Sequence, residues 1–466
     1  MAMDLKDLPV RYLGVPLIST KLKAVDCECI KDRMLKRVSS WTSKKLSYAG
    51  RIQLVVSVLH GIQAYWSSIF ILPKKVLHEV EDILRRFIWS GPELNKNGAK
   101  VAWADICCPH KEGGLGIKDI VVWNKASMVR HIWDLARKKD SLWVKWCHQY
   151  RLKNKSLWGG TWSTETSWTW NKLMKLRSEI WDFIKYKVGN GESVWCWFDN
   201  WHSEGPLYQK FGYRIVYDAA SNLKARMKEF IVNNDWVLPR AVSSDLVHVI
   251  NQWPAYRPSA DREDEVIWTL SNDGEFSVKS VWERLRRRYP LVGWHNLVWH
   301  KDSIPRCSFI CWLACRNRLR TKEKLFRWGV IDNSHCVLCG NAEKTRDHLF
   351  FQCSYSKFVW QSILANLNFC YQCSNWEEEV DQACRRFKGK EFQARLGRVA
   401  FSVTVYFVWM ERNSRIFQGK NRLECVLVRE IENFVVSTAC RWSARRNYCN
   451  WVICRQWGLS ERVLAV

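Results

Sequence analysis

The sequence is poor in acidic side chains. Its 466 residues include 46 Asp and Glu against 73 Lys and Arg, which gives a net charge of +27. Such an excess of positive charge disfavours cationic ligands and favours a polyanionic partner, most simply a nucleic acid. A basic but otherwise ordinary protein is the alternative. An apolar content of 47% is enough for large cores, and a chain of this length predicts two to four domains.

Several signatures of catalysis and cofactor binding are missing. Gly113-Gly-Leu-Gly116 lacks both the lysine of the GxxxxGK[ST] motif and the spacing of GxGxxG, so we expect a tight turn instead of a phosphate loop. Asp82 stands where a zincin would need a second histidine after His78-Glu79. A zinc deaminase is disfavoured as well, because in that class His-x-Glu precedes the Cys-x-x-Cys pair.

Segments that would enter a membrane are also lacking. Ile52–Leu72 has no charged side chain and is long enough to cross a bilayer, but Gln53, His60 and Gln63 interrupt it. Its apolar residues recur at helical spacing, which favours a buried amphipathic helix and no contact with a membrane. Residues 1–17 are too polar for a signal peptide. The 19 cysteines are therefore expected to be reduced thiols, in the nucleus or the cytoplasm.

The sequence does contain a compact set of metal-ligand residues. Cys336, Cys339, His348 and Cys353 follow the spacing C-x2-C-x8-H-x4-C. Three thiols and one imidazole suit a tetrahedral zinc ion, and a closed set of four ligands favours a structural zinc. Thr345 is a candidate N-cap for a short helix carrying His348. The alternative is four scattered residues in a cysteine-rich chain.

Hydrophobic periodicity predicts a mainly α fold with small β-hairpins, an α+β architecture. Helices are expected at residues 26–45, 51–72, 76–88, 123–138, 305–313, 321–329 and 354–367, followed by a mainly helical tail. A further helix, capped by Ser277 or Ser280, is expected to run to about residue 288. One hairpin is expected at Gly189-Asn-Gly191, leading to a strand at 194–198, and another at Asn272-Asp-Gly274, between strands at 266–270 and 275–278. Residues 12–17 suggest the end of a strand, and residues 203–265 a loose connector with short helices.

Positive charge is concentrated in two regions, residues 21–60 and residues 278–330. The candidate nucleic-acid contacts are Arg316, Arg318, Arg320, Lys322 and Lys324 in the second region and Lys44, Lys45 and Arg51 in the first. Tryptophans alternate with these cations, a combination that suits base stacking beside phosphate contact. Burial of the tryptophans in a core is the alternative, and we favour it.

Short motifs occur in an order that resembles a known family. In chain order they are Tyr12-Leu-Gly-Val-Pro-Leu17, Ala49-Gly-Arg51, Phe87-Ile-Trp89, Gly113-Gly-Leu-Gly116, Gly189-Asn-Gly191, Trp197-Phe-Asp199-Asn-Trp201, the stretch from Phe276 to Trp360, and Trp409-Met-Glu-Arg-Asn413 with Ile416-Phe417. This order resembles the C-terminal part of plant LINE-type non-LTR retrotransposon reverse transcriptases, including their reverse-transcriptase zinc-binding domain. The resemblance covers nearly the whole chain.

The resemblance implies a division of the chain. The implied parts are a remnant of the palm and primer-grip strand at 1–20, a helical thumb-like domain at 21–150, a Trp-rich connector at 151–265, the zinc-binding domain at 266–367 and a helical C-terminal extension at 368–466. The thumb would track a template–primer duplex. The zinc-binding domain would bind the RNA of the element or its target DNA.

One departure from the family concerns catalysis. Reverse transcriptases use paired aspartates, typically Tyr/Phe-x-Asp-Asp, to hold the divalent metal for nucleotidyl transfer. No Asp-Asp dipeptide occurs in this sequence, and no fingers or palm precede Tyr12. We therefore expect no polymerase activity, but a noncatalytic, zinc-containing fragment that binds RNA or DNA. Two alternatives stay open: part of an active RNA-directed DNA polymerase completed by a separate palm, and a host interaction protein that uses the zinc domain.

Overall fold

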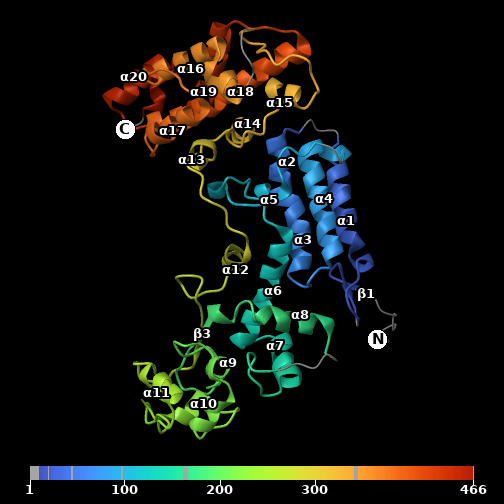
Figure 1. Ribbon diagram of the computed structural model, residues 1–466, viewed down its shortest axis with the longest axis vertical. Coiled ribbons are helices and arrows are strands. Elements are labelled where there is room, and N and C mark those ends of the chain that lie inside the picture. The colour runs from blue at the N-terminus through green and yellow to red at the C-terminus, as the bar shows by residue number, and fades with distance from the viewer. Residues whose placement is uncertain are drawn as a thin grey trace. The chain divides into compact units, whose positions relative to one another are not determined.

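The computed structural model describes residues 10–18, 20–42, 46–95, 98–160, 166–340 and 345–464. These residues are mostly helical, with three two-stranded antiparallel sheets, in agreement with the expected mainly α class (Figure 1). The chain forms two compact units, each assembled from separate segments. The first unit contains residues 1–33, 61–81 and 119–287, and the second contains 34–60, 82–118 and 288–466. The domain boundaries implied by the family resemblance stay predictions.

The N-terminal motif is a β-hairpin. Strand β1, Val10–Tyr12, pairs with β2, Val15–Leu17, through a two-residue turn at Leu13 and Gly14. Both turn residues have positive φ, 49° and 80°, as in the type I′ turn that suits the twist of a hairpin. The expectation of one strand was therefore wrong, because the glycine reverses the chain inside the apolar run.

The first half of the chain contributes long amphipathic helices. They are α1 at Glu28–Ser39, α2 at Tyr48–Leu54, a π-helical turn at Val55–Leu59, α3 at His60–Ser67, α4 at Lys74–Ser90 and α6 at Ile120–Ala136. Apart from α2, which has no fully buried residue, their apolar sides are buried, as the periodicity predicted, with Val55, Leu59 and Trp66 fully inaccessible. Among the described residues, no helix is long and apolar enough to cross a membrane.

Helix α3 ends earlier than expected. It stops at Ser67, although the predicted helix extends to residue 72. Asn124 of α6 replaces the missing helical hydrogen bonds: its amide nitrogen donates to the carbonyls of Ser67 (3.2 Å) and Phe70 (2.8 Å), and its oxygen accepts from the backbone N–H of Leu72 (2.9 Å). The end is therefore set by a side chain distant in sequence, which local signals do not reveal.

In the part of the chain that the structure describes, neither of the two expected hairpins forms, the one at Gly189-Asn-Gly191 or the one at Asn272-Asp-Gly274. Strand β3, Ile184–Lys187, pairs instead with β6, Glu265–Trp268, so that Ile184 lies opposite Trp268. The two glycine-containing turns do form, but among the described residues their flanking segments do not form a ladder. One backbone hydrogen bond, from the N–H of Trp268 to the carbonyl of Gly274 (2.9 Å), closes the second turn. The turn at Gly189 is held by the Asp264 carboxylate, which accepts backbone hydrogen bonds from Gly189 (2.8 Å), Gly191 (2.8 Å) and Ser193 (2.7 Å).

Residues 203–265 contain short helices, as predicted, but they are not loose. They form α9 at Leu207–Phe211, α10 at Tyr213–Asp218, β4 at Ile231–Val232, β5 at Asp235–Trp236 and α11 at Ser244–Asn251. Their buried residues, among them Val216 and Leu246, belong to the same hydrophobic core as Trp197 and Trp268. Helices α7 at Leu142–Trp146, α8 at Trp168–Arg177 and α12 at Val278–Leu285 complete this unit. Weak sequence periodicity here reflects short elements, each of which is stabilised by the shared core.

The second unit is built on the C-terminal helices. Besides α2 and parts of α1 and α4, it contains α5 at Trp103–Ile106, α13 at His295–Val298, α14 at Pro305–Cys315, α15 at Lys322–Arg327, the π-helical turn η8 at His348–Gln352, α16 at Ser354–Asn366, α17 at Trp376–Arg386, α18 at Phe392–Gln418, α19 at Glu424–Ala439 and α20 at Tyr448–Gln456. Helix α18 is packed against α14, α16, α17 and α19. The long helix is therefore the scaffold for the segments that precede it.

The glycine stretch at 113–116 is a turn, as predicted. Gly113 has a φ of 83°, and a Cβ at Gly114 would lie 2.0 Å from the carbonyl oxygen of Cys108. No side chain other than hydrogen fits at that distance. The carbonyl of Gly113 accepts a hydrogen bond from the indole of Trp312 (2.8 Å), so the turn anchors α14.

Candidate metal centre and its basic surroundings

The first two metal-ligand candidates lie on a tight turn between α15 and η8. The turn closes where the backbone N–H of Gly340 donates to the carbonyl of Cys336 (2.8 Å). Gly340 has a φ of 80°, which glycine adopts without steric cost. The N–H of Leu338 points at the Cys336 sulfur (3.4 Å). A backbone donor in this position favours a negatively charged thiolate.

The other two candidates lie at opposite ends of one helical turn. The hydroxyl oxygen of Thr345 accepts a hydrogen bond from the backbone N–H of His348 (3.1 Å), which confirms the predicted cap. η8 begins at His348, and the N–H of Cys353 donates to the His348 carbonyl (2.7 Å). One short turn of helix therefore places the imidazole and the third thiol on the same side.

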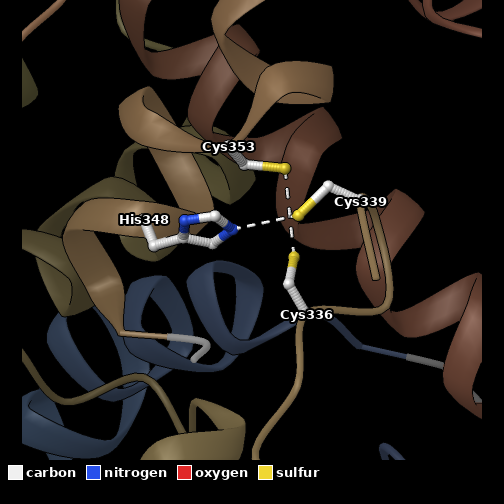
Figure 2. A group of neighbouring side chains, drawn as sticks. All are labelled: Cys336, Cys339, His348 and Cys353. Atoms are coloured by element: carbon white, nitrogen blue, oxygen red, sulfur yellow. Dashed lines mark hydrogen bonds between the residues drawn. The ribbon is translucent and has the colours of Figure 1, made fainter. Parts of the chain in front are cut away.

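The four side chains converge on one point (Figure 2). The sulfurs of Cys336 and Cys353 are 3.9 Å apart, the Cys339 sulfur is 3.3 Å from His348 Nε2, and all four ligand atoms lie within 4.8 Å of one another. Zinc–ligand bonds of about 2.3 Å to sulfur and 2.0–2.1 Å to nitrogen give tetrahedral edges of about 3.8 Å and 3.6 Å. The arrangement therefore fits a tetrahedral zinc ion.

The chemistry of the four ligands agrees with the geometry. Cys336 and Cys353 are buried. Their mutual hydrogen bond, and then burial, raise the pKa of the Cys353 thiol. A buried pair of thiols loses its protons when a cation compensates the thiolates, which couples metal binding to folding. In the described part of the chain this is the one group of three or more potential ligands close enough for a metal.

Helix α18 holds the turn that carries Cys336 and Cys339. The guanidinium of Arg415 donates to the carbonyls of Val337 (3.2 Å) and Leu338 (3.1 Å). These are the two residues between the cysteines, so Arg415 fixes the backbone that orients both thiols. Such outer-shell contacts orient metal ligands and tune affinity for the metal.

A buried carboxylate holds Arg415 in turn. Glu411 is fully inaccessible, and it accepts hydrogen bonds from Arg415 Nε (2.7 Å) and Arg422 Nε (2.7 Å). Burial by itself would raise the pKa of Glu411, but the bonds from the two arginines bring it below the usual value. Sequence reasoning did not find this support, although Glu411 and Arg415 have the i,i+4 spacing of a helical ion pair.

Comparison with known proteins places this centre in a family context. Residues 276–360 match the family described as zinc-binding in reverse transcriptase. The matched segment contains all four candidate ligands, and it relates this part of the chain to reverse transcriptases. The matched segment begins two residues before α12 and ends within α16.

Two proteins of Arabidopsis thaliana are similar over longer stretches. One, named for ribonuclease H, is 25% identical over 374 residues, which cover 75% of this chain and 58% of that protein. The other, an uncharacterized mitochondrial protein, is 23% identical over 149 residues, which cover 32% of this chain and 97% of that protein. The chain therefore spans somewhat more than half the length of the first relative.

Some of the side chains predicted to contact nucleic acid bind other groups of the protein in the structure. Arg316 is 3.2 Å from the carboxylate of Asp105, and Lys324 donates to the side-chain oxygen of Asn317 (2.8 Å). The side chain of Arg51, a residue of α2, reaches the C-terminal end of α4 and donates to the carbonyl of Ile88 (3.3 Å). These side chains stabilise local structure, and their contacts with nucleic acid stay predictions.

Other predicted contacts are available to a ligand. Arg318 and Arg320 are exposed, and neither has a carboxylate partner within the described ranges. The carbonyl of Arg320 accepts a hydrogen bond from Arg412 of α18 (3.1 Å), so the helix that supports the metal centre also supports this segment. Lys322 is half-buried. Lys44 and Lys45 lie outside the described residues.

The tryptophans of the basic region divide into two groups. Trp282 and Trp312 are buried in the cores, as expected from the favoured alternative. Trp328 differs, because 60% of its surface is exposed one residue after Arg327. Of these three side chains, Trp328 has the exposure that base stacking needs.

Proposed function

We propose that this protein is a noncatalytic, zinc-containing, nucleic-acid-binding fragment related to the reverse transcriptase of a plant LINE-type retroelement. The observation that carries the proposal is the convergence of three cysteines and one histidine inside the segment that matches the reverse-transcriptase zinc-binding family. The net charge of +27 supports a nucleic acid as the partner. RNA or DNA would be bound in the nucleus or the cytoplasm.

The role proposed for zinc is structural. Four protein ligands leave no open position for a reacting water, which is typical of sites that stabilise a fold. Zinc would hold the 336–339 turn against η8, while Arg415 and Arg412 of α18 tie that turn and residue 320 to the same helix. The bound metal would thereby fix the exposed Arg318 and Arg320 relative to the rest of the unit.

The proposal of no polymerase activity follows from the absent Asp-Asp dipeptide, since a two-metal mechanism needs carboxylates to hold its metals. A polymerase completed by a separate palm is the competing function. It predicts that a palm-bearing partner would restore DNA synthesis on a primed RNA template.

Nucleic-acid binding is tested by a salt titration. The zinc-loaded full chain is titrated into a fluorescent 12-nucleotide RNA and a fluorescent DNA duplex, and anisotropy gives the affinity at 50 and 200 mM salt. If six cations contact duplex phosphates, the affinity should fall about a thousandfold over this range because condensed counterions are released. An affinity that is the same at both salt concentrations would contradict the proposal and favour a protein-interaction role.

A further inference from the structure

The second unit contains a cavity that none of the predicted contacts lines. It has a volume of about 620 Å³ and lies between the 293–301 segment, the C-terminal end of α17 and the start of α18. Small-molecule sites commonly have about 300–1,000 Å³. The cavity is therefore large enough for a ligand of nucleotide size.

The charged side chains that line this cavity are all basic. Its lining includes Lys301, Lys388, Lys390 and Arg398 and no carboxylate. The neighbouring Asp302 is engaged by Arg395, which donates two hydrogen bonds of 2.9 Å to its two oxygens. Within the described ranges no carboxylate lies within ion-pair distance of the three lysines. The cavity therefore offers several uncompensated cations to an anion.

The wall of the cavity also has polar atoms without partners. Both ring nitrogens of His300 and the indole nitrogen of Trp299 are buried and have no hydrogen-bond partner in the described structure. Burial lowers the pKa of His300 to about 4, so the neutral ring presents one donor and one acceptor. These nitrogens are closed to solvent in the structure, so a ligand reaches them only when the rings turn toward the cavity. Buried polar groups without partners are costly, and a ligand with complementary donors and acceptors would remove that cost.

The rim that carries two of the lysines has a defined shape. Arg398 donates to the backbone carbonyl of Gly389 (2.9 Å) and to that of Phe387, which precedes Lys388. Gly389 itself has a φ of 107°, a conformation that other residues rarely adopt. The turn between α17 and α18 is therefore held so that Lys388 and Lys390 stand at the mouth of the cavity.

We infer that this cavity binds one nucleotide of a single-stranded nucleic acid, with the lysines at its phosphates and His300 at the edge of its base. The inference rests on the proposed function and specifies a site for it. Uncompensated cations recognise phosphate, and an unpaired donor and acceptor recognise a base edge. A base paired in a duplex is not free to enter a cavity, so a single strand is required.

The experiment uses the zinc-loaded full chain and a 12-nucleotide single-stranded RNA containing 4-thiouridine. Anisotropy gives the affinity, and photocrosslinking with mass spectrometry gives the contact site. The variant K388A/K390A is compared with K185A/K187A, a matched pair of exposed lysines with the same spacing on β3. We expect about tenfold weaker binding for the first pair and less than twofold for the second. The salt slope should fall by about 1.4, since each single-strand contact contributes about 0.7.

A second variant tests the base edge. H300F keeps an aromatic ring but removes both nitrogens, so the crosslink yield at residues 296–301 should fall while the salt slope is unchanged. Zinc content and melting temperature equal to wild type would establish that both variants are folded.

The possible failures are distinguishable. An RNA that does not bind the wild-type chain at any salt concentration would refute the proposed function. An RNA that binds but crosslinks elsewhere, with equal effects of the two lysine pairs, would refute only the cavity. If polyglutamate suppresses the crosslink as effectively as a mononucleotide does, the cavity recognises charge alone. That result would overturn the assignment to a nucleotide.

Discussion

The support of the metal centre by α18 leads to a prediction that leaves all four ligands intact. Replacing Arg415 by Met keeps an unbranched apolar stem but removes the guanidinium and its hydrogen bonds to the carbonyls of Val337 and Leu338 and to Glu411. The turn that carries Cys336 would then lose its attachment to α18. We expect the variant to bind zinc, but more weakly.

The magnitude follows from two contributions. Loss of an outer-shell contact commonly weakens metal binding about 10- to 100-fold, which corresponds to roughly 1.4–2.8 kcal/mol. Removing one member of a buried ion pair costs about 3–5 kcal/mol of folding stability because the other charge stays buried. Arg422 still contacts Glu411 at 2.7 Å, so the lower end of that range is expected.

Two measurements test this prediction. Competition with a chromophoric chelator gives the zinc affinity, and urea unfolding at saturating zinc gives the free energy of unfolding. Arg429→Met is the matched control, because Arg429 is exposed on α19 and has no ion-pair partner among the described residues. Wild-type zinc affinity and wild-type stability in the Arg415 variant would refute the role assigned to α18.

Three further predictions concern the ligands, the basic segment and catalysis. The purified chain should contain about one zinc per molecule, and C336S/C339S should lose it and destabilise residues 300–367; full zinc retention would sink the ligand assignment. R318A/R320A should weaken binding to all sequences alike and flatten the salt slope by about one unit per lost contact, whereas an unchanged slope would remove these arginines from the binding surface. The pure chain should not synthesise DNA on a primed RNA template with magnesium or manganese. Incorporation that survives removal of contaminating polymerases would contradict this expectation.

The sequence by itself determined the features that depend on near neighbours. The spacing of Cys336, Cys339, His348 and Cys353, the cap at Thr345 and the start of α14 at Pro305 all agree with the structure. Each arises from contacts within a few residues or one helical turn, where chain geometry leaves little choice. The amphipathic helices were predictable for the same reason, since their apolar faces follow a fixed period.

Tertiary structure decided which distant groups meet. β3 pairs with β6 rather than with its neighbour in sequence, and Asn124 ends α3. Arg51 and Arg316 looked available as cations in the sequence but bind a helix end and a carboxylate. Buried backbone and charged groups take whichever partner the fold brings near, because leaving them unpaired costs free energy. The spacing of residues along the chain does not reveal which distant groups become partners. The support of the metal centre by Glu411 and Arg415 was therefore visible only in the tertiary structure.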